Sequence, residues 1–542
     1  MKDWVKEAIV YQIYPRSFLD TNGDGIGDLP GIIQKLDYLR DLGVNALWLS
    51  PVYASPNDDN GYDISDYYSV NPEFGTLSDL QKLIGEAKAR GIRILMDLVI
   101  NHTSVEHPWF QASRDPQSPY HEYYIWREGL DGGKRPPNNW TSFFGGGAWE
   151  RDEQNGLYYL HLFSPKMADL NYNHAPVAEE IKRIMRYWLD MGIAGFRCDV
   201  INVISKRTLQ DGRKRFALTG REHYLSAEGC HTLLKSFRED VLSEYDCFTV
   251  GETVMVTPKT ANELCKELDM VFSFAHMETD QINNKWFKTR FKPHKFFNVL
   301  ETWQSGVAWN ANYFENHDQP RSVSRFGYDL PLYRYYSATS LATVLLALRG
   351  TPYIYAGQEI GMTNGYFTGM GDIRDTESFN INALAKKLRF PEKFRWKLIM
   401  RTSRDNARTP MQWNGGANGG FTEGEPWLGV NRNASYINAE ADENAENSII
   451  QYYRRLILLR KTLPSLIDGN FTRLPAPAGV FAFRREFEGE AVVAVCSLVK
   501  NERALFKPVS GEVLAGNYIK PAGNEICLRS VRPYEAILLR QK

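Results

Sequence analysis

Eight short runs of β-branched and aromatic residues recur along this chain of 542 residues, and stretches with helical periodicity separate most of them. The runs are 8–14, 46–50, 92–100, 195–200, 247–252, 270–274, 310–314 and 351–357. Their nearly continuous apolar character is typical of a parallel sheet that is covered on both faces. Between the first two runs, Ile32, Leu36 and Leu39 fall on one face of a helix expected over 29–43. The alternation predicts an α/β fold, a parallel (β/α)8 TIM barrel with an outer ring of helices.

Two segments depart from this alternation. Residues 101–173 follow the third run, are rich in Trp, Tyr, Gly and Pro, and lack long helical periodicity. After residue 465 the pattern changes to short alternating strands such as "GVFAFRREF" and "AVVAVCSLV". We therefore expect a barrel domain over 1–103 and 174–464, an inserted subdomain over 104–173 at the barrel mouth, and a C-terminal antiparallel β domain over 465–542.

Charge and composition exclude several classes of partner. The formal net charge is -1, from 64 basic and 65 acidic residues, so no global field would gather nucleic acid or an anionic membrane. We find no signal-peptide core and no run of about 18 apolar residues. The six cysteines show no C-x-x-C spacing, which argues against a zinc site or a disulfide framework. A cytoplasmic protein without an organic cofactor is expected, as a monomer or small homo-oligomer.

Carboxylates stand at or near the ends of several predicted strands. They are Asp97 in the third run, Asp199 in the fourth, Glu252 in the fifth and Asp318 just after the seventh. Each alone could cap a following helix, but in a parallel barrel all four converge on one mouth, where active sites form. Arg197 projects to the same side of its strand as Asp199 and can offset their repulsion. Such a group of acids suits acetal chemistry, in which one acid protonates a leaving oxygen and another stabilises or attacks the sugar carbon.

Four of these segments carry a family resemblance. "DLVINH" (97–102), "GFRCDVIN" (195–202), "VGE" (250–252) and "ENHD" (315–318) resemble, in order and spacing, the four signature regions of the α-amylase family, glycoside hydrolase family thirteen. Further segments, including "DNGYDISDY", "GTPYIYAGQEIGMTN" and "SRDNARTPMQW", are similar to its oligo-1,6-glucosidase, dextran glucosidase and α-glucosidase branch. The resemblance covers about residues 3–460. Cys198 departs from it, standing where relatives usually carry Met or Leu, and so does Ala168, which replaces a Pro.

The resemblance implies a role for each acid. Asp199 would be the nucleophile, Glu252 the general acid/base, and Asp318 the acid that holds the sugar 2- and 3-hydroxyls and stabilises the transition state. Arg197 would keep Asp199 ionised. The other implied pocket residues are His102 and His317 for glucose hydroxyls, Asp63 and Arg408 for the 4-hydroxyl side, Tyr62 as a stacking ring, and Phe144 and Phe163 as walls.

The loop "DTNGDGIGD" alternates oxygen-bearing side chains with glycine, like the first part of a calcium loop. A helix-loop-helix calcium site would need a Glu at the twelfth position, where this chain has Gly31. A tight polar turn without metal is the alternative. The family resemblance favours one structural Ca2+, with its ligands supplied by Asp20, Asn22, Asp24, the Ile26 carbonyl and Asp28.

The expected function is a retaining, exo-acting α-glucosidase that releases glucose from non-reducing-end α-1,6 bonds of small oligosaccharides, with α-1,4 bonds as additional candidate substrates. The linkage preference rests on Val200, because α-1,6-cleaving relatives resemble this chain in carrying Val-Ile after the nucleophile. One small side-chain change usually shifts specificity only modestly, so an ordinary strand valine is the alternative.

Three other functions are considered. Trehalose-6-phosphate hydrolases share nearly all these motifs, and a basic cluster could bind a phosphate: Lys206, Arg207, Arg213, Lys214, Arg215 and Arg221. A solvated basic face is the alternative for that cluster. A sucrose isomerase is less favoured, because no Arg-Leu-Asp-Arg-like segment follows "SRFG". The non-catalytic heavy subunit of amino-acid transporters shares the barrel, but that function predicts a transmembrane segment and lost catalytic acids, and the sequence shows neither.

Overall fold

The computed structural model describes residues 2–282, 284–519 and 523–541. Its largest sheet has eight parallel strands in the order β13-β12-β11-β5-β2-β1-β17-β16, and its end strands β13 and β16 are adjacent, so the sheet nearly closes into a barrel. The strands are β1 Val10–Ile13, β2 Ala46–Leu49, β5 Arg93–Leu98, β11 Gly195–Cys198, β12 Phe248–Glu252, β13 Met270–Phe272, β16 Ala311–Asn312 and β17 Thr351–Tyr355. Each strand lies within one of the eight predicted runs, so the barrel prediction is confirmed.

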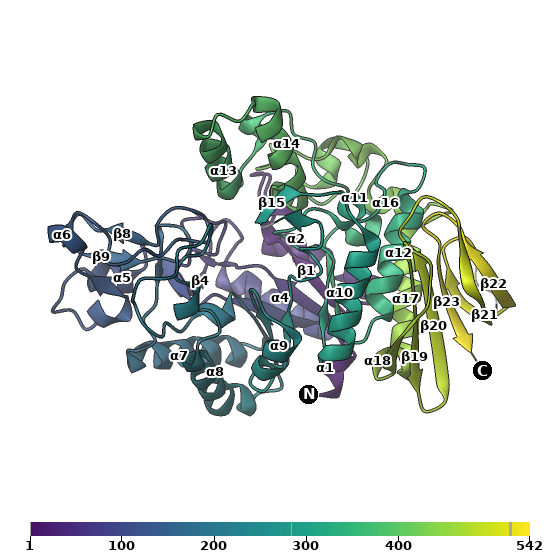
Figure 1. The fold of residues 1–542 in the computed structure, drawn as a ribbon, viewed down its shortest axis with the longest axis horizontal. Helices are drawn as coiled ribbons and strands as arrows, with labels where there is room; N and C mark the ends of the chain where they lie inside the picture. Colours follow the sequence, from purple (N-terminus) through teal and green to yellow (C-terminus); the bar gives the residue numbers. More distant parts are fainter. Residues whose placement is uncertain (1, 283, 520–522, 542) are drawn as a thin grey trace.

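Helices surround the sheet (Figure 1). They include α2 Leu29–Gln34, α3 Leu36–Leu42, α4 Leu77–Ala89, α7 Ala175–Asp190, α8 Glu228–Asp240, α9 Pro258–Leu264, α10 Pro293–Gly306, α12 Arg334–Ala347 and α17 Ile449–Thr462. The single helix expected over 29–43 is wrong, because the chain leaves helical geometry at Lys35 (φ −102°, ψ 5°). The break has a packing reason: α2 lies against α4 whereas α3 lies against α17. Among the described residues, no helix is long and apolar enough to cross a membrane.

The segment after the third barrel strand forms a small body beside the mouth. Its ends are joined by antiparallel pairing of β6 His102–Ser104 with β10 Met167–Asp169. Between them lie α5 Pro108–Ser113 and a three-stranded sheet of β7 Trp126–Arg127, β9 Tyr158–Leu160 and β8 Trp149–Arg151. A bond between two fully buried groups, Lys206 Nζ and Asp169 Oδ2 at 2.7 Å, ties this body to the loop that follows β11.

The C-terminal region is a six-stranded antiparallel sheet, as expected. Its order is β18-β19-β20-β23-β21-β22, with β18 Asn470–Leu474, β19 Val480–Phe487, β20 Glu490–Ser497, β21 Arg503–Gly516, β22 Glu525–Val531 and β23 Ala536–Gln541. One face of the sheet packs against α12, which is buried on all sides from Ser337 to Ala347. The barrel and this sheet therefore share one continuous apolar core.

A helical pair after the last barrel strand was not expected from the sequence. It consists of α13 Thr376–Lys387 and α14 Glu392–Thr402, and we call it the mouth lobe. Figure 1 shows the lobe projecting from the barrel next to β15 Asn284–Lys288. It packs on a small apolar core that is separate from the main core. The small core includes Phe367, Ile373 and Ile399. The lobe therefore shares this core with residues outside its two helices, including Trp286 of β15 and Leu428.

Candidate active site

The barrel brings the predicted catalytic acids together. Asp199 directly follows β11 and Glu252 is the last residue of β12, so neighbouring parallel strands deliver both carboxylates to the mouth. One guanidinium joins them: Arg197 Nη1 lies 2.7 Å from Asp199 Oδ1, and Nη2 lies 2.9 Å from Glu252 Oε2. Arg197 Nη1 also binds Asp97. All four side chains are less than a tenth exposed, so a single cation balances three buried acids.

The charge state of Asp199 follows from this enclosure. Burial raises the pKa of its carboxyl well above the ordinary value, and Glu252 and Asp97 raise it further, while Arg197 lowers it. Arg197 therefore favours ionised Asp199, as expected, but does not outweigh burial in the free protein. Glu252 raises the pKa of Asp199 because two like charges this close repel each other. A glycosidase uses a neighbouring pair of this kind as one carboxylate and one carboxylic acid.

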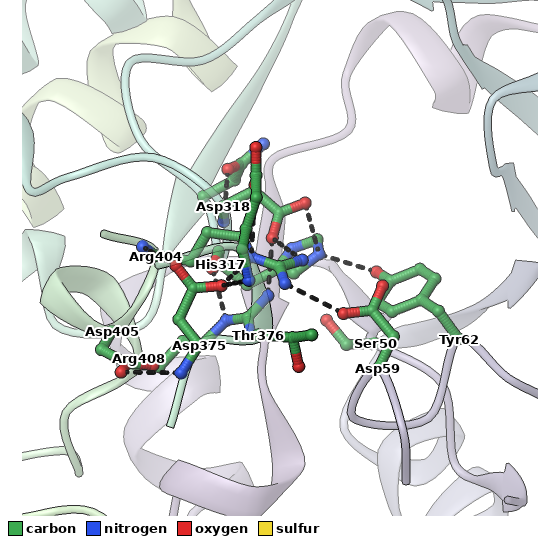
Figure 2. A network of polar contacts seen from close by, with 12 residues as sticks. Ser50, Asp59, Tyr62, His317, Asp318, Asp375, Thr376, Arg404, Asp405 and Arg408 are labelled. Carbon is green, nitrogen blue, oxygen red and sulfur yellow. Dashed lines mark hydrogen bonds and ion pairs between the residues drawn. The ribbon is translucent and has the colours of Figure 1, made fainter. Parts of the chain in front are cut away.

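Asp318 occupies the opposite charge environment. Burial alone would raise the pKa of its carboxyl, but His317, Arg404 and Arg408 together hold it well below the ordinary value. Arg408 Nη2 lies 2.7 Å from Asp318 Oδ1, and Arg404 Nη1 lies 3.6 Å from the same oxygen. Figure 2 shows the arginines and His317 around this carboxylate. Asp318 therefore stays ionised and can stabilise positive charge on a sugar ring.

His317 links Asp318 to the floor of the pocket. The Gln12 amide nitrogen lies 2.8 Å from His317 Nδ1 and orients the imidazole so that Nε2 points the other way. That nitrogen faces the Tyr62 hydroxyl at 2.8 Å and Asp318 Oδ2 at 3.3 Å. The Tyr62 and His317 rings are stacked, with centroids 5.3 Å apart. Tyr62 is thus fixed as a flat surface, in keeping with its predicted stacking role.

The inserted body supplies the other wall. The Phe163 ring lies against His102, with centroids 5.2 Å apart, and Phe144 meets Phe163 edge-on. His102 is buried, and burial lowers its pKa to about 4, so it is neutral near pH 7. Its Nε2 lies 3.2 Å from the Tyr62 carbonyl oxygen. The aromatic walls are therefore connected to the stacking platform through a neutral histidine.

The structure does not bring the Asp63 and Arg408 side chains into contact with each other. The Asp63 carboxylate accepts hydrogen bonds from Ser55 Oγ and from the backbone N–H groups of residues 58 and 59, within its own loop. Those bonds are local, and the side chain is fully buried away from both arginines. The acid that faces the arginines is Asp59, whose Oδ1 lies 3.0 Å from Arg404 Nη2. Arg408 instead binds Asp318, as described above.

Arg404 is the most connected residue that the sequence analysis missed. It binds Asp59, Asp318 and, through Nε at 2.8 Å, Asp375 at the start of the mouth lobe. Its guanidinium also lies over the Phe144 ring of the inserted body. Arg404 belongs to the quoted segment "SRDNARTPMQW", so the motif drew attention to the right stretch but not to this arginine. Figure 2 shows Arg404 within the polar network that includes Asp59, Asp318 and Asp375.

The predicted phosphate-binding cluster does not act as a unit. Lys206 is buried, with its amine bound to Asp169 and, at 2.8 Å, to Asn101 Oδ1. Arg215 lies 3.6 Å from Glu222, while Arg221 contacts the Met255 sulfur at 3.4 Å. The cluster is thus split between a buried structural lysine and side chains on a surface loop.

The predicted calcium loop is compact and rich in oxygen atoms. Asp20 Oδ1 accepts hydrogen bonds from the N–H groups of residues 22 and 23, and Asp28 Oδ1 accepts one from the N–H of Gly31. Asn22 and Asp24 make similar bonds within the loop. Among the described residues, no three Asp, Glu, His or Cys side chains are grouped to hold a metal by themselves. The all-oxygen donor set fits Ca2+ only if the Asn22 amide and the Ile26 carbonyl also take part.

Paired carboxylates on one arginine, a third ionised acid and stacking rings at the mouth of a (β/α)8 barrel define a glycoside hydrolase. The comparison with known families agrees: residues 12–469 match the catalytic domain of alpha amylase, and the chain belongs to the alpha-amylase family. It is 45% identical to an oligo-1,6-glucosidase from Parageobacillus thermoglucosidasius over 98% of each chain.

Two solved structures are also similar to this chain. A trehalose-6-phosphate hydrolase from Bacillus licheniformis is 40% identical, with a TM-score of 0.92, over 99% of this chain and 100% of that one. An isomaltulose synthase from Klebsiella sp. LX3 is 38% identical, with a TM-score of 0.95, over 99% of each chain. The fold is thus shared by relatives with different named activities.

Proposed function

We propose that this enzyme hydrolyses α-1,6-glucosidic bonds at the non-reducing end of small oligosaccharides and releases glucose with retention. The observation that carries the proposal is the joining of Asp199 and Glu252 by one guanidinium, because retaining enzymes need carboxyl groups only about 5 Å apart. Several curated relatives at 43–45% identity over nearly the full length are named oligo-1,6-glucosidases.

The reaction proceeds in two steps. An Asp199 oxygen attacks C1 of the terminal glucose, while Glu252 gives its proton to the glycosidic oxygen as the C1–O bond breaks. Water then attacks C1 of the glycosyl ester, Glu252 takes up the water proton, and glucose is released. Asp318 and His317 bind the ring hydroxyls and stabilise the positive charge that develops in both transition states.

Exo action is supported by the closed end of the pocket. Arg404 joins Asp59, Asp318 and Asp375, which come from three separate segments, and we infer that this network blocks a second sugar behind the first. The α-1,6 preference still rests on Val200, directly after the nucleophile. The trehalose-6-phosphate alternative has less support, because Lys206 is committed to Asp169.

A substrate panel tests this proposal. The purified protein would be given isomaltose, panose, maltose, sucrose and trehalose 6-phosphate, with the anomer of the released glucose followed by NMR. We expect the highest kcat/KM for isomaltose and initial release of the α-anomer. A large preference for trehalose 6-phosphate or for maltose would refute the assigned specificity, and release of the β-anomer would refute retention.

We further propose a structural Ca2+ in the loop of Asp20, Asn22, Asp24, the Ile26 carbonyl and Asp28. Its role would be to hold the loop after β1, and no chemical step needs it. Removing metal with a chelator is expected to lower the thermal unfolding midpoint, and added Ca2+, but not Mg2+, to restore it. An unchanged midpoint, with no calcium in the protein by elemental analysis, would leave the polar turn as the better description. The expected cytoplasmic location and small assembly remain predictions.

A further inference from the structure

Val200, directly after the nucleophile, has an unusual backbone. Its φ is 35° and its ψ is 39°, which is the left-handed region. Among the described residues outside glycine, Val200 is the only β-branched one with positive φ. A branched Cβ crowds the backbone in that region, so this geometry persists only where the surrounding structure enforces it. Strain of this kind beside a nucleophile calls for a functional explanation.

The left-handed turn directs a backbone donor at the general acid. The Val200 N–H donates to Glu252 Oε2, with an N···O distance of 3.2 Å. The same oxygen lies 2.9 Å from Arg197 Nη2. An oxygen that receives two N–H donors, one of them charged, acts as an acceptor and does not carry the acid proton. The proton of Glu252 is therefore placed on Oε1.

We propose that Val200 is a positioning residue for proton transfer: its strained turn holds Glu252 so that Oε1 faces the glycosidic oxygen. The proposal rests on the proposed function and adds to it, because it assigns the proton to one oxygen and the orientation to a backbone amide. It differs from the view that Val200 affects only the space available to the leaving sugar.

Three substrates separate the two roles. Isomaltose has a leaving sugar and needs a proton on its leaving oxygen. Methyl α-glucoside needs the proton but has almost no leaving-group bulk, and α-glucosyl fluoride needs neither. A defect in acid positioning therefore slows the first two substrates together, whereas a defect in leaving-sugar space changes isomaltose alone.

The sharpest variant replaces the Val200 amide with an ester by incorporating the matching α-hydroxy acid, which removes the N–H and keeps the side chain. We expect kcat/KM to fall about tenfold for both isomaltose and methyl α-glucoside, and to stay unchanged for α-glucosyl fluoride. The matched control is the same ester at Val203, whose N–H donates to the Val200 carbonyl at 3.0 Å in the same turn. The control should leave the ratios among the three substrates unchanged.

The outcomes are distinct. If the Val200 ester slows all three substrates equally, or changes isomaltose alone, the positioning role is refuted. If the unmodified enzyme hydrolyses neither isomaltose nor α-glucosyl fluoride, the proposed function fails instead.

Discussion

At the scale of single residues, the pocket depends on how a few arginines divide their contacts among many acids. Arg197 serves Asp97, Asp199 and Glu252, and Arg404 serves Asp59, Asp318 and Asp375. The first set is left with a raised pKa at Asp199, and the second with a lowered pKa at Asp318. Burial dominates at Asp199, whereas His317 and the two arginines dominate at Asp318, so the pKa values of two aspartates in one site are shifted in opposite directions.

Arg404→Met tests the second set. Without the Arg404 guanidinium, Asp59 and Asp375 stay buried with one cation fewer, which typically costs about 3–5 kcal/mol of stability. The pKa of Asp318 would rise, because Arg404 is among the groups that lower it. As pH falls, Asp318 is then protonated sooner, so the acid limb of kcat/KM for isomaltose moves to higher pH.

Two further variants make that test specific. Arg404→Lys keeps the charge and should recover part of the acid limb. Arg401→Met is the matched control, because Arg401 lies near the end of α14 and donates to the carbonyls of residues 288 and 289 instead of to the pocket acids. Overlapping pH profiles for Arg404→Met and the unmodified enzyme would show that Arg404 does not control the charge of Asp318.

The sequence could identify the catalytic acids but not every pocket neighbour. Asp199, Glu252 and Asp318 follow strands whose apolar pattern is clear, so barrel geometry alone brings them together. The choice between Asp59 and Asp63 depends on a turn in which Asn57 and Asn60 have positive φ. Such a turn reverses side-chain directions within a few residues. Because "NDDNGYD" (57–63) contains three aspartates, the sequence does not show which of them faces the arginines. The backbone geometry of this turn determines that Asp59 contacts Arg404, and the sequence does not predict that geometry.

At the scale of elements, strands were easier to predict than the mouth lobe. A barrel strand is apolar throughout, whereas α13 and α14 bury only a few residues each, and their pattern resembles that of an ordinary surface helix. The place where the mouth lobe attaches to the barrel also depends on tertiary contacts, which the sequence pattern does not show. Asp375 caps α13 by accepting from the N–H of Glu377, and binds Arg404 as well, so one side chain fixes both the helix start and its place over the pocket.

Asp375→Asn is expected to loosen the lobe without unfolding the barrel. Burial alone would raise the pKa of Asp375, but Arg404 and Arg408 hold it well below the ordinary value, so the native contact is an ion pair. The amide can still cap α13, but it loses the charge. Hydrogen exchange should accelerate across 376–402 and stay unchanged in the barrel strands. Asp372→Asn, which affects an exposed contact with Thr368 in the same region, is the control. Equal exchange in both variants would argue against this anchor.

At the scale of the whole molecule, the barrel and the C-terminal sheet are joined by buried arginines that bind backbone carbonyls. Arg485 of β19 donates to the carbonyl of Ala347 at the end of α12. Arg460 of α17 donates both to the carbonyl of Leu348 after α12 and to that of Leu466, which leads into the C-terminal sheet. Burial lowers the pKa of both guanidinium groups. Residues far apart in the sequence supply these contacts, so the pattern of the chain predicts the two domains but not the bonds that join them.

Arg485→Met tests whether these bonds hold the domains together. The variant removes an unpaired buried charge, which favours stability, but it also strips donors from the carbonyls of Ala347, Ile467 and Gly469. Each buried carbonyl that loses its donor costs about 1–3 kcal/mol of stability. Three such losses should exceed the stability gained by removing the buried charge, because the same carbonyls already solvate that charge. We expect a loss of about 3 kcal/mol of stability, seen as a lower denaturant midpoint.

The control variant is Arg484→Met. Arg484 is the partly exposed neighbour that pairs with Glu486, so this change should alter stability by less than about 0.5 kcal/mol. If Arg485→Met proved as stable as the unmodified enzyme, the cost of burying its charge would equal the value of its hydrogen bonds, and packing alone would join the two domains.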